Sequence, residues 1–271
     1  MKGNKLFIHV LLIIGAFIMI LPFLWMISTS FKSYGDSMQV PPDLIPKVWH
    51  PENYSKVFES VDFLKYYINT IIVTAGRTLS QLFLCSLAAF AFARMKFPFK
   101  NVIFIVILSV LMVPPQVILI PNYAILTKLG WIDTFYALIV PGIFSAFGVF
   151  LLRQFFMGIP KELDEAAIID GCSWWGIYWR VLLPNATPAL IALGIFTALA
   201  SWNDFLWPLI MTNSENMRVL SIGIASFQGQ YSTNYPLLMA GALLSTIPMI
   251  ILFILLQRHL IAGISLSGVR K

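Results

Sequence analysis

The sequence predicts an all-α integral membrane protein with six membrane-spanning helices and with both termini in the cytoplasm. Three observations lead to this prediction. The composition is strongly apolar, the chain contains six long apolar runs, and its basic residues are unevenly divided between the loops that join these runs.

The composition separates this chain from soluble proteins. Of its 271 residues, 59% are hydrophobic and 11% are charged, whereas a soluble domain carries about 25% charged residues. The net charge is +6, but the basic residues flank apolar runs and form no stripe, which argues against nucleic-acid binding. The two cysteines, Cys85 and Cys172, are expected in or below the membrane as free thiols.

The first predicted span covers residues 6–27 and follows Lys2 and Lys5. At 1.5 Å per residue it reaches roughly 30 Å, one hydrocarbon thickness. It is longer than the apolar region of a signal peptide, so we expect a retained span with its N-terminus inside. The next segment, 31–65, contains four prolines and is expected outside the cell without long regular helices.

Five further spans are predicted at residues 66–93, 101–121, 134–152, 185–211 and 236–256. They must be helices because lipid satisfies no backbone groups. Five prolines interrupt these spans and are either packing features or gating kinks: Pro114, Pro115, Pro141, Pro208 and Pro248. The chain then divides into an N-terminal span with its extracytoplasmic loop (1–66), a permease core (67–258) and a cytoplasmic tail (259–271).

The distribution of charge orients the predicted spans. Eleven of the 18 Lys and Arg residues fall on the side of the termini, six fall on the other side, and Arg77 falls within a span. Cytoplasmic loops of membrane proteins carry an excess of Lys and Arg. The loop 159–184 is therefore predicted to lie in the cytoplasm.

This loop reads as two short helices divided by a glycine. Pro160 is suited to the first helical position, and Gly171 supplies a stop that tolerates a left-handed backbone. Ser173 is placed to cap the second helix, and Pro184 is expected to end it. The acidic residues of the first helix lie in its first turns, where the helix dipole favours them: Glu162, Asp164 and Glu165.

The loop also carries a recognisable spacing. Glu165-Ala166-Ala167, then Gly171, then Val181-x-Leu183-Pro184 resembles the EAA loop of ABC-importer permeases, with valine in place of isoleucine. The resemblance implies a coupling helix that docks into a cleft of a cytosolic ATPase. Independently of the resemblance, Ala166 and Ala167 are expected to form one small, smooth surface that another protein can approach closely. An ordinary amphipathic loop is the alternative. The implied coupling residues are Glu165, Ala166, Ala167, Asp170, Gly171, Leu183 and Pro184.

Further stretches, including 150–156, 202–209, 227–231 and 257–263, are similar to carbohydrate-uptake permeases of the maltose-type second subunit. This resemblance implies a type I (MetI-like) permease fold in a bacterial or archaeal plasma membrane. It implies as partners a second, different permease, two ATPase subunits and an extracytoplasmic solute-binding protein that delivers a sugar or oligosaccharide. A glycerol-phosphate-type or polyol cargo, and more distantly an ion-coupled secondary transporter, remain alternatives.

A candidate substrate pathway lies in the fifth span. Trp202, Asn203, Asp204 and Trp207 combine aromatic rings with an amide and a carboxylate, a surface that suits a polyhydroxylated ligand. An interfacial aromatic belt with a solvated aspartate explains them equally well. Arg77 either pairs with a carboxylate of this chain or a partner, or is a snorkelling structural arginine.

Motifs for catalysis and metal binding are missing from the sequence. There is no Gly-x-x-x-x-Gly-Lys-Ser/Thr phosphate loop and no Gly-x-Ser-x-Gly elbow. His9, His50 and His259 are scattered, so no metal site is expected. We therefore expect no enzyme activity and no bound cofactor in this chain, and we place ATP and Mg²⁺ on the partner ATPase.

Overall fold

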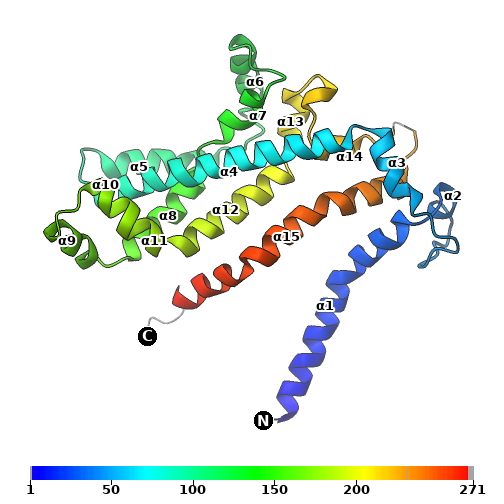
Figure 1. Ribbon diagram of the computed structural model, residues 1–271, viewed down its shortest axis with the longest axis horizontal. Coiled ribbons are helices and arrows are strands. Elements are labelled where there is room, and N and C mark those ends of the chain that lie inside the picture. The colour runs from blue at the N-terminus through cyan, green and yellow to red at the C-terminus, as the bar shows by residue number, and fades with distance from the viewer. Residues whose placement is uncertain (1, 230, 268–271) are drawn as a thin grey trace. The chain divides into compact units, whose positions relative to one another are not determined.

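The computed structural model describes residues 2–229 and 231–267, and within them it contains helices and no strand beyond one isolated bridge (Figure 1). This confirms the all-α prediction. The chain forms two compact units. The first comprises Met1–Tyr67 and Val219–Pro248, and the second comprises Ile68–Arg218 and Met249–Lys271.

The first unit anchors the end of a long apolar helix. The side-chain amide of Asn53 donates hydrogen bonds of 2.9 Å to the carbonyls of Ser30 and Lys32, and the hydroxyls of Ser30 and Tyr54 lie 2.9 Å apart. The segment 31–65 contains only short helices before α4, as its prolines predict. The elements are α1 (Lys2–Ser30), α2 (Tyr34–Ser37), α3 (Glu52–Ser60), the start of α4 (Phe63–Arg94), α14 (Leu220–Ala225) and the first part of α15 (Tyr235–Ser267), as far as Pro248.

The second unit holds the rest of α4, the rest of α15 and the remaining helices. Its core lies where α4, α8 and α12 meet the 159–184 loop, around the fully buried Leu152, Phe156 and Ile177. Its further elements are α5 (Lys100–Ser109), η1 (Val110–Met112), α6 (Leu119–Lys128), α7 (Phe135–Ile139), η2 (Val140–Gly142), α8 (Ala146–Gly158), α9 (Glu162–Ile169), α10 (Trp174–Gly176), the π-helix η3 (Ile177–Leu182), α11 (Leu183–Asn185), α12 (Thr187–Trp202), α13 (Leu206–Met211) and η4 (Glu215–Met217).

Among the described residues, four helical stretches are long and apolar enough to cross a membrane: Phe7–Ser30, Phe63–Arg94, Phe135–Gly158 and Tyr235–Gln257. A fifth is possible if Trp174–Asn185 and Thr187–Trp202, which meet at 76°, form one bent span. The count of six spans and the cytoplasmic termini stay predictions. The proposed tail 259–271 lies entirely outside the residues whose side chains the structure describes.

Two predicted spans differ from the observed helices. The predicted span 101–121 is interrupted, because the helix Lys100–Met112 stops before Pro114 and Pro115, and α6 starts only at Leu119. The predicted span 185–211 is divided between α12 and α13. Proline lacks an N–H and disfavours a helical conformation at the preceding residue, which explains the first break.

Candidate functional site

The coupling segment, residues 159–184, folds as two short helices with a glycine between them, as predicted. Gly171 has φ +81°. Its N–H donates to the carbonyl of Ile168 at 2.9 Å, and the N–H of Cys172 donates to the carbonyl of Ala167 at 2.8 Å. This pair of backbone hydrogen bonds around a left-handed residue is a Schellman motif, and it ends α9. Ser173 caps α10 by accepting a bond of 3.3 Å from the N–H of Gly176.

The two prolines of this segment behave differently from the prediction. Pro160 precedes α9, which begins at Glu162 after Lys161, so the proline is not the first helical residue. Pro184 lies inside α11 and does not end the helix. The π-helical turn η3 comes directly before it, and the bend of 76° follows at Ala186. The wider turn fits here because proline has no N–H to donate.

One side of α9 is packed onto the rest of the second unit. Asp164 and Ala167 are buried, and Arg94 forms an ion pair with Asp164. The expectation that Ala166 and Ala167 form one exposed surface is therefore wrong for Ala167, which joins the apolar core. The helical spacing explains this result, because residues three apart lie on the same face.

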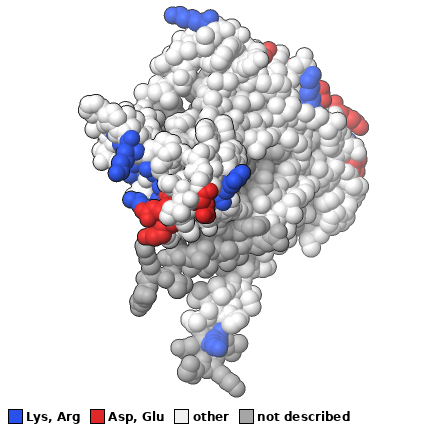
Figure 2. Space-filling view, turned by 60° about the vertical axis from the view of Figure 1, so that its left-hand side comes forward, with Lys and Arg blue, Asp and Glu red and all other residues white. Residues whose placement is uncertain are grey.

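The other side of the coupling segment is exposed. Glu165, Ala166 and Asp170 are exposed, and Ile169 is 85% exposed. Figure 2 shows charged side chains of both signs gathered at the end of the molecule that carries α9 in Figure 1. Tryptophans of the segment are also exposed: Trp174, Trp175 and Trp179. Near the end of the segment, Leu183 is half-buried and Pro184 is exposed.

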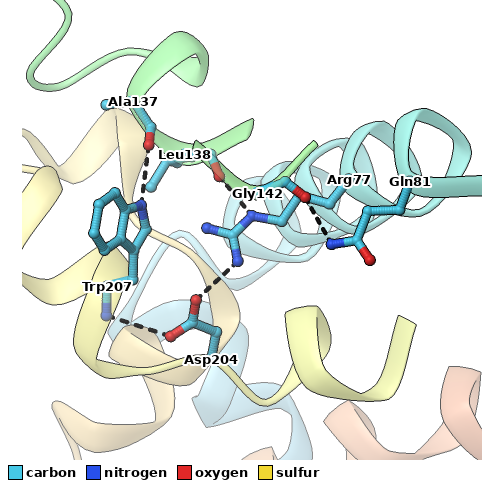
Figure 3. A network of polar contacts seen from close by, with 7 residues as sticks. All are labelled: Arg77, Gln81, Ala137, Leu138, Gly142, Asp204 and Trp207. Atoms are coloured by element: carbon cyan, nitrogen blue, oxygen red, sulfur yellow. Dashed lines mark hydrogen bonds and ion pairs between the residues drawn. The ribbon is translucent and has the colours of Figure 1, made fainter. Parts of the chain in front are cut away.

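A second polar arrangement centres on Arg77 of α4 (Figure 3). Its Nη1 lies 2.9 Å from Oδ2 of Asp204, and its Nε donates to the carbonyl of Leu138 at 2.6 Å. The Asp204 carboxylate also accepts from the backbone N–H of Trp207 at 3.3 Å. The indole N–H of Trp207 donates to the carbonyl of Ala137 at 3.0 Å. Of the sequence alternatives for Arg77, pairing with a carboxylate of this chain is confirmed.

The network satisfies backbone groups that broken helices leave free. The helix that starts at α7 is interrupted at Pro141 and Gly142 before α8 begins. Gln81, one turn after Arg77, donates to the carbonyl of Gly142 at 2.7 Å and accepts a bond of 3.0 Å from Thr197. Backbone breaks at membrane depth require such partners.

The structure brings together only some of the residues predicted for the substrate pathway. Arg77, Asp204 and Trp207 lie together (Figure 3), whereas the Asn203 amide bonds back to the carbonyl of Leu199 at 2.9 Å and Trp202 is buried. Sequence reasoning missed Gln81, Thr197 and Gly142. Gln81 is a polar residue in an apolar run, one helical turn from Arg77, and this spacing was the available signal.

Two cavities of about 380 Å³ and about 340 Å³ meet at the ion pair, and both are lined by Arg77, Gly142 and Asp204. The larger cavity is further lined by Gln116, Asn122 and Trp207 among others, and the smaller by Gln81 and Phe196 among others. These volumes lie within the usual range for small-molecule sites.

Gly142 lets Arg77 approach the broken helix closely. A Cβ atom at Gly142 would lie 2.9 Å from both Cδ and Nε of Arg77, which must then shift. We expect Gly142→Ala to lower the free energy of unfolding by about 1–3 kcal/mol through overpacking. Gly158→Ala is the matched control, because nothing lies within 4 Å of its Cβ position. Thermal unfolding in detergent measures both variants, and equal stability would contradict the prediction.

Comparison with known proteins identifies the family of this chain. A family model described as binding-protein-dependent transport system inner membrane component matches residues 81–266. The arabinooligosaccharides transport system permease protein AraQ of Halalkalibacterium halodurans is 36% identical, and the match covers 94% of this chain and 92% of that protein.

Other relatives differ in the cargo that they are named for. The trehalose/maltose transport system permease protein MalG of Thermococcus litoralis is 32% identical, with 97% of each chain covered. The sn-glycerol-3-phosphate transport system permease protein UgpE of Yersinia enterocolitica is 31% identical, with 97% of this chain and 96% of that protein covered.

Solved structures support the same fold. A chain of a bacterial ABC transporter involved in the import of the acidic polysaccharide alginate has a TM-score of 0.83 at 22% identity. The match covers 95% of this chain and 96% of that chain. A chain of a bacterial alginate ABC transporter, in complex with an alginate pentasaccharide-bound periplasmic protein, has a TM-score of 0.64 at 17% identity and covers 94% and 93%. The chain therefore belongs to the family of binding-protein-dependent transport system inner membrane components and is a multi-pass permease subunit of an ABC transporter.

Proposed function

We propose that this chain is one of two different permease subunits of an importer that moves a sugar or oligosaccharide across a bacterial or archaeal plasma membrane. An extracytoplasmic solute-binding protein delivers the cargo, and two ATPase subunits in the cytoplasm hydrolyse ATP. The observation that carries this proposal is the coupling segment, in which α9 is packed on one side through Asp164 and Ala167 and exposes Glu165 and Ala166 on the other.

The exposed face of α9 is the proposed docking surface for the ATPase. Glu165, Ala166 and Asp170 are its polar and small residues, and Ile169 extends it with an apolar side chain. Gly171 ends this helix in a fixed geometry. Protein interfaces combine an apolar centre with a polar rim, and this face offers both.

The two cavities beside Arg77 and Asp204 are proposed to belong to the substrate pathway, together with Trp207, which lines the larger one. The amides of Gln116 and Asn122, with the indole ring, suit the hydroxyl groups and apolar faces of a sugar.

The charges of these cavities favour a neutral cargo over a phosphate-bearing one. Among the described residues that line them, the charged ones are Arg77 and Asp204, and these form an ion pair with each other. Recognition of a phosphate normally uses a cation that is available for charge-assisted hydrogen bonds. A glycerol-phosphate-type cargo is therefore the second choice.

Affinity purification of the tagged chain from its native membrane, followed by mass spectrometry, tests the proposal. We expect a second permease, an ATPase with a phosphate loop and a solute-binding protein to be recovered with it. A parallel purification of an unrelated tagged membrane protein gives the background. Recovery of a stable chain without any ATPase would contradict the proposal.

The cargo is tested in proteoliposomes that contain the recovered subunits. We expect ATP-dependent accumulation of a neutral saccharide from a labelled set of arabinotriose, maltose and trehalose, and none of labelled sn-glycerol-3-phosphate. The same liposomes without ATP are the control. Accumulation of sn-glycerol-3-phosphate and of none of the saccharides would overturn the choice of a neutral cargo.

A further inference from the structure

Arg94, the last residue of α4, contacts the coupling segment at two points. Its Nε lies 2.5 Å from Oδ2 of Asp164 in the first turn of α9. Its Nη2 donates to the carbonyl of Ile159 at 2.9 Å, just after α8 ends. One planar guanidinium thus holds both the first residue of the coupling segment, Ile159, and its first helix, α9, to the end of α4.

The burial of this pair makes it a rigid connection. The two side chains are 3% and 8% exposed, whereas exposed ion pairs exchange with water and contribute little. Burial raises the pKa of Asp164 above its ordinary value, against the opposing effect of Arg94 and Lys161. Each charge of the pair is therefore costly to leave alone, and the two side chains stay together.

Other contacts place the coupling segment on the same face of α4. The hydroxyls of Ser86 and Tyr178 lie 2.8 Å apart, and the rings of Phe90 and Tyr178 have centroids 5.4 Å apart. Ser86, Phe90 and Arg94 are spaced four residues apart, so they form one stripe along the helix. Through this stripe the segment is attached to α4 over two helical turns.

The same helix carries Arg77 at the cavities. α4 runs without a proline to Arg94, and the 17 residues from Arg77 to Arg94 correspond to about 26 Å of helix. A displacement of the end of α4 is therefore transmitted to the Arg77–Asp204 pair along one continuous hydrogen-bonded helix. Packed helices move as units by such shifts.

We propose that Arg94 and Asp164 are positioning residues that make α9 move together with α4, so that displacement of the coupling segment by the ATPase reaches Arg77 beside the cavities. This inference rests on the proposed function. It gives the pair a role in energy coupling, beyond the assembly of the transporter.

The experiment uses the full chain with its recovered partner subunits in proteoliposomes, and it measures saccharide uptake and ATP hydrolysis in the same sample. The uptake probe is the labelled set of arabinotriose, maltose and trehalose. Asp164→Asn keeps the shape of the side chain without its charge, and Arg94→Lys keeps the charge without the two-point contact. For both we expect assembly and ATP hydrolysis to persist while sugar imported per ATP falls about tenfold, a size typical of coupling between sites.

Arg153→Gln is the matched control. Arg153 also lies beside the end of α4, where its Nε donates to the carbonyl of Phe92 at 3.3 Å and its guanidinium lies 4.1 Å from the ring centroid of Phe104. Neither of these two contacts involves the coupling segment. The ratio of sugar to ATP in this variant should stay at the wild-type value, even where assembly is somewhat reduced.

A double variant separates coupling from mere stabilisation. Arg94→Met with Asp164→Leu replaces the pair by apolar side chains, which can restore stability, but we expect the sugar-to-ATP ratio to remain low. A wild-type ratio in the double variant, or in both single variants, would overturn the proposal. Absence of ATP-dependent uptake in the wild-type complex would instead refute the proposed function, so the two failures are distinguishable.

Discussion

Replacing Gly171 with proline is expected to reduce saccharide uptake to background while the subunits still assemble. Gly171 has φ +81°, whereas proline fixes φ near −65°. Proline would also remove the N–H that donates to the carbonyl of Ile168 at 2.9 Å. The turn between α9 and α10 must then change, and with it the surface that α9 presents to the ATPase. Uptake and ATP hydrolysis measured together in proteoliposomes check this expectation.

Gly130 provides a control with the same local geometry. It has φ +69°, its N–H donates to the carbonyl of Thr127 at 3.0 Å, and the next N–H donates to the carbonyl of Leu126 at 2.9 Å. Gly130→Pro therefore breaks an equivalent Schellman motif outside the coupling segment. We expect this variant to keep the wild-type ratio of sugar to ATP. If sugar imported per ATP fell equally in both variants, the turn at Gly171 would have no special role in coupling.

Local signals explain why the coupling segment was predictable. The left-handed glycine at 171 and the cap at Ser173 are decided by residues within a few positions along the chain, and both are observed. The two prolines were misplaced because their effect depends on the neighbouring turn geometry. A π-helix before Pro184 has no reliable sequence pattern.

The long-range partners were not predictable in the same way. Arg94 has an obvious local role as a basic residue at the inner end of a span, and Asp164 has one as an acid near a helix N-terminus. These local roles are sufficient explanations in the sequence, so nothing there indicates that the two side chains are buried against each other. Arg77 and Asp204 are 127 positions apart, and only the packing of α4 against the broken helices brings them together.

Neutralising Asp204 alone is expected to destabilise the protein strongly. The Arg77–Asp204 pair has side chains that are 11% and 23% exposed, and Arg77 is also held by the carbonyl of Leu138. Removing one partner of a buried ion pair costs about 3–5 kcal/mol, because the remaining charge is left uncompensated. Asp204→Asn should therefore unfold at a clearly lower temperature in detergent and should accumulate less in the membrane.

An exposed ion pair provides the control for this stability effect. Lys47 and Asp43 lie 2.9 Å apart with side chains that are 69% and 39% exposed. Asp43→Asn removes the same kind of charge from a pair that water already screens. Its unfolding temperature should match the wild type. If the two aspartate variants were equally stable, the buried pair would not be a stabilising element of the second unit.

A double variant then decides whether the pair also serves transport. Arg77→Gln with Asp204→Asn leaves no unpaired charge and keeps hydrogen-bonding groups at both positions, so most of the lost stability should return. Because the pair lies where the two cavities meet, uptake should stay about tenfold below the wild type, a loss within the range of energetic couplings between sites. Wild-type uptake in this variant would make the pair a structural element alone and would remove Arg77 and Asp204 from the substrate pathway.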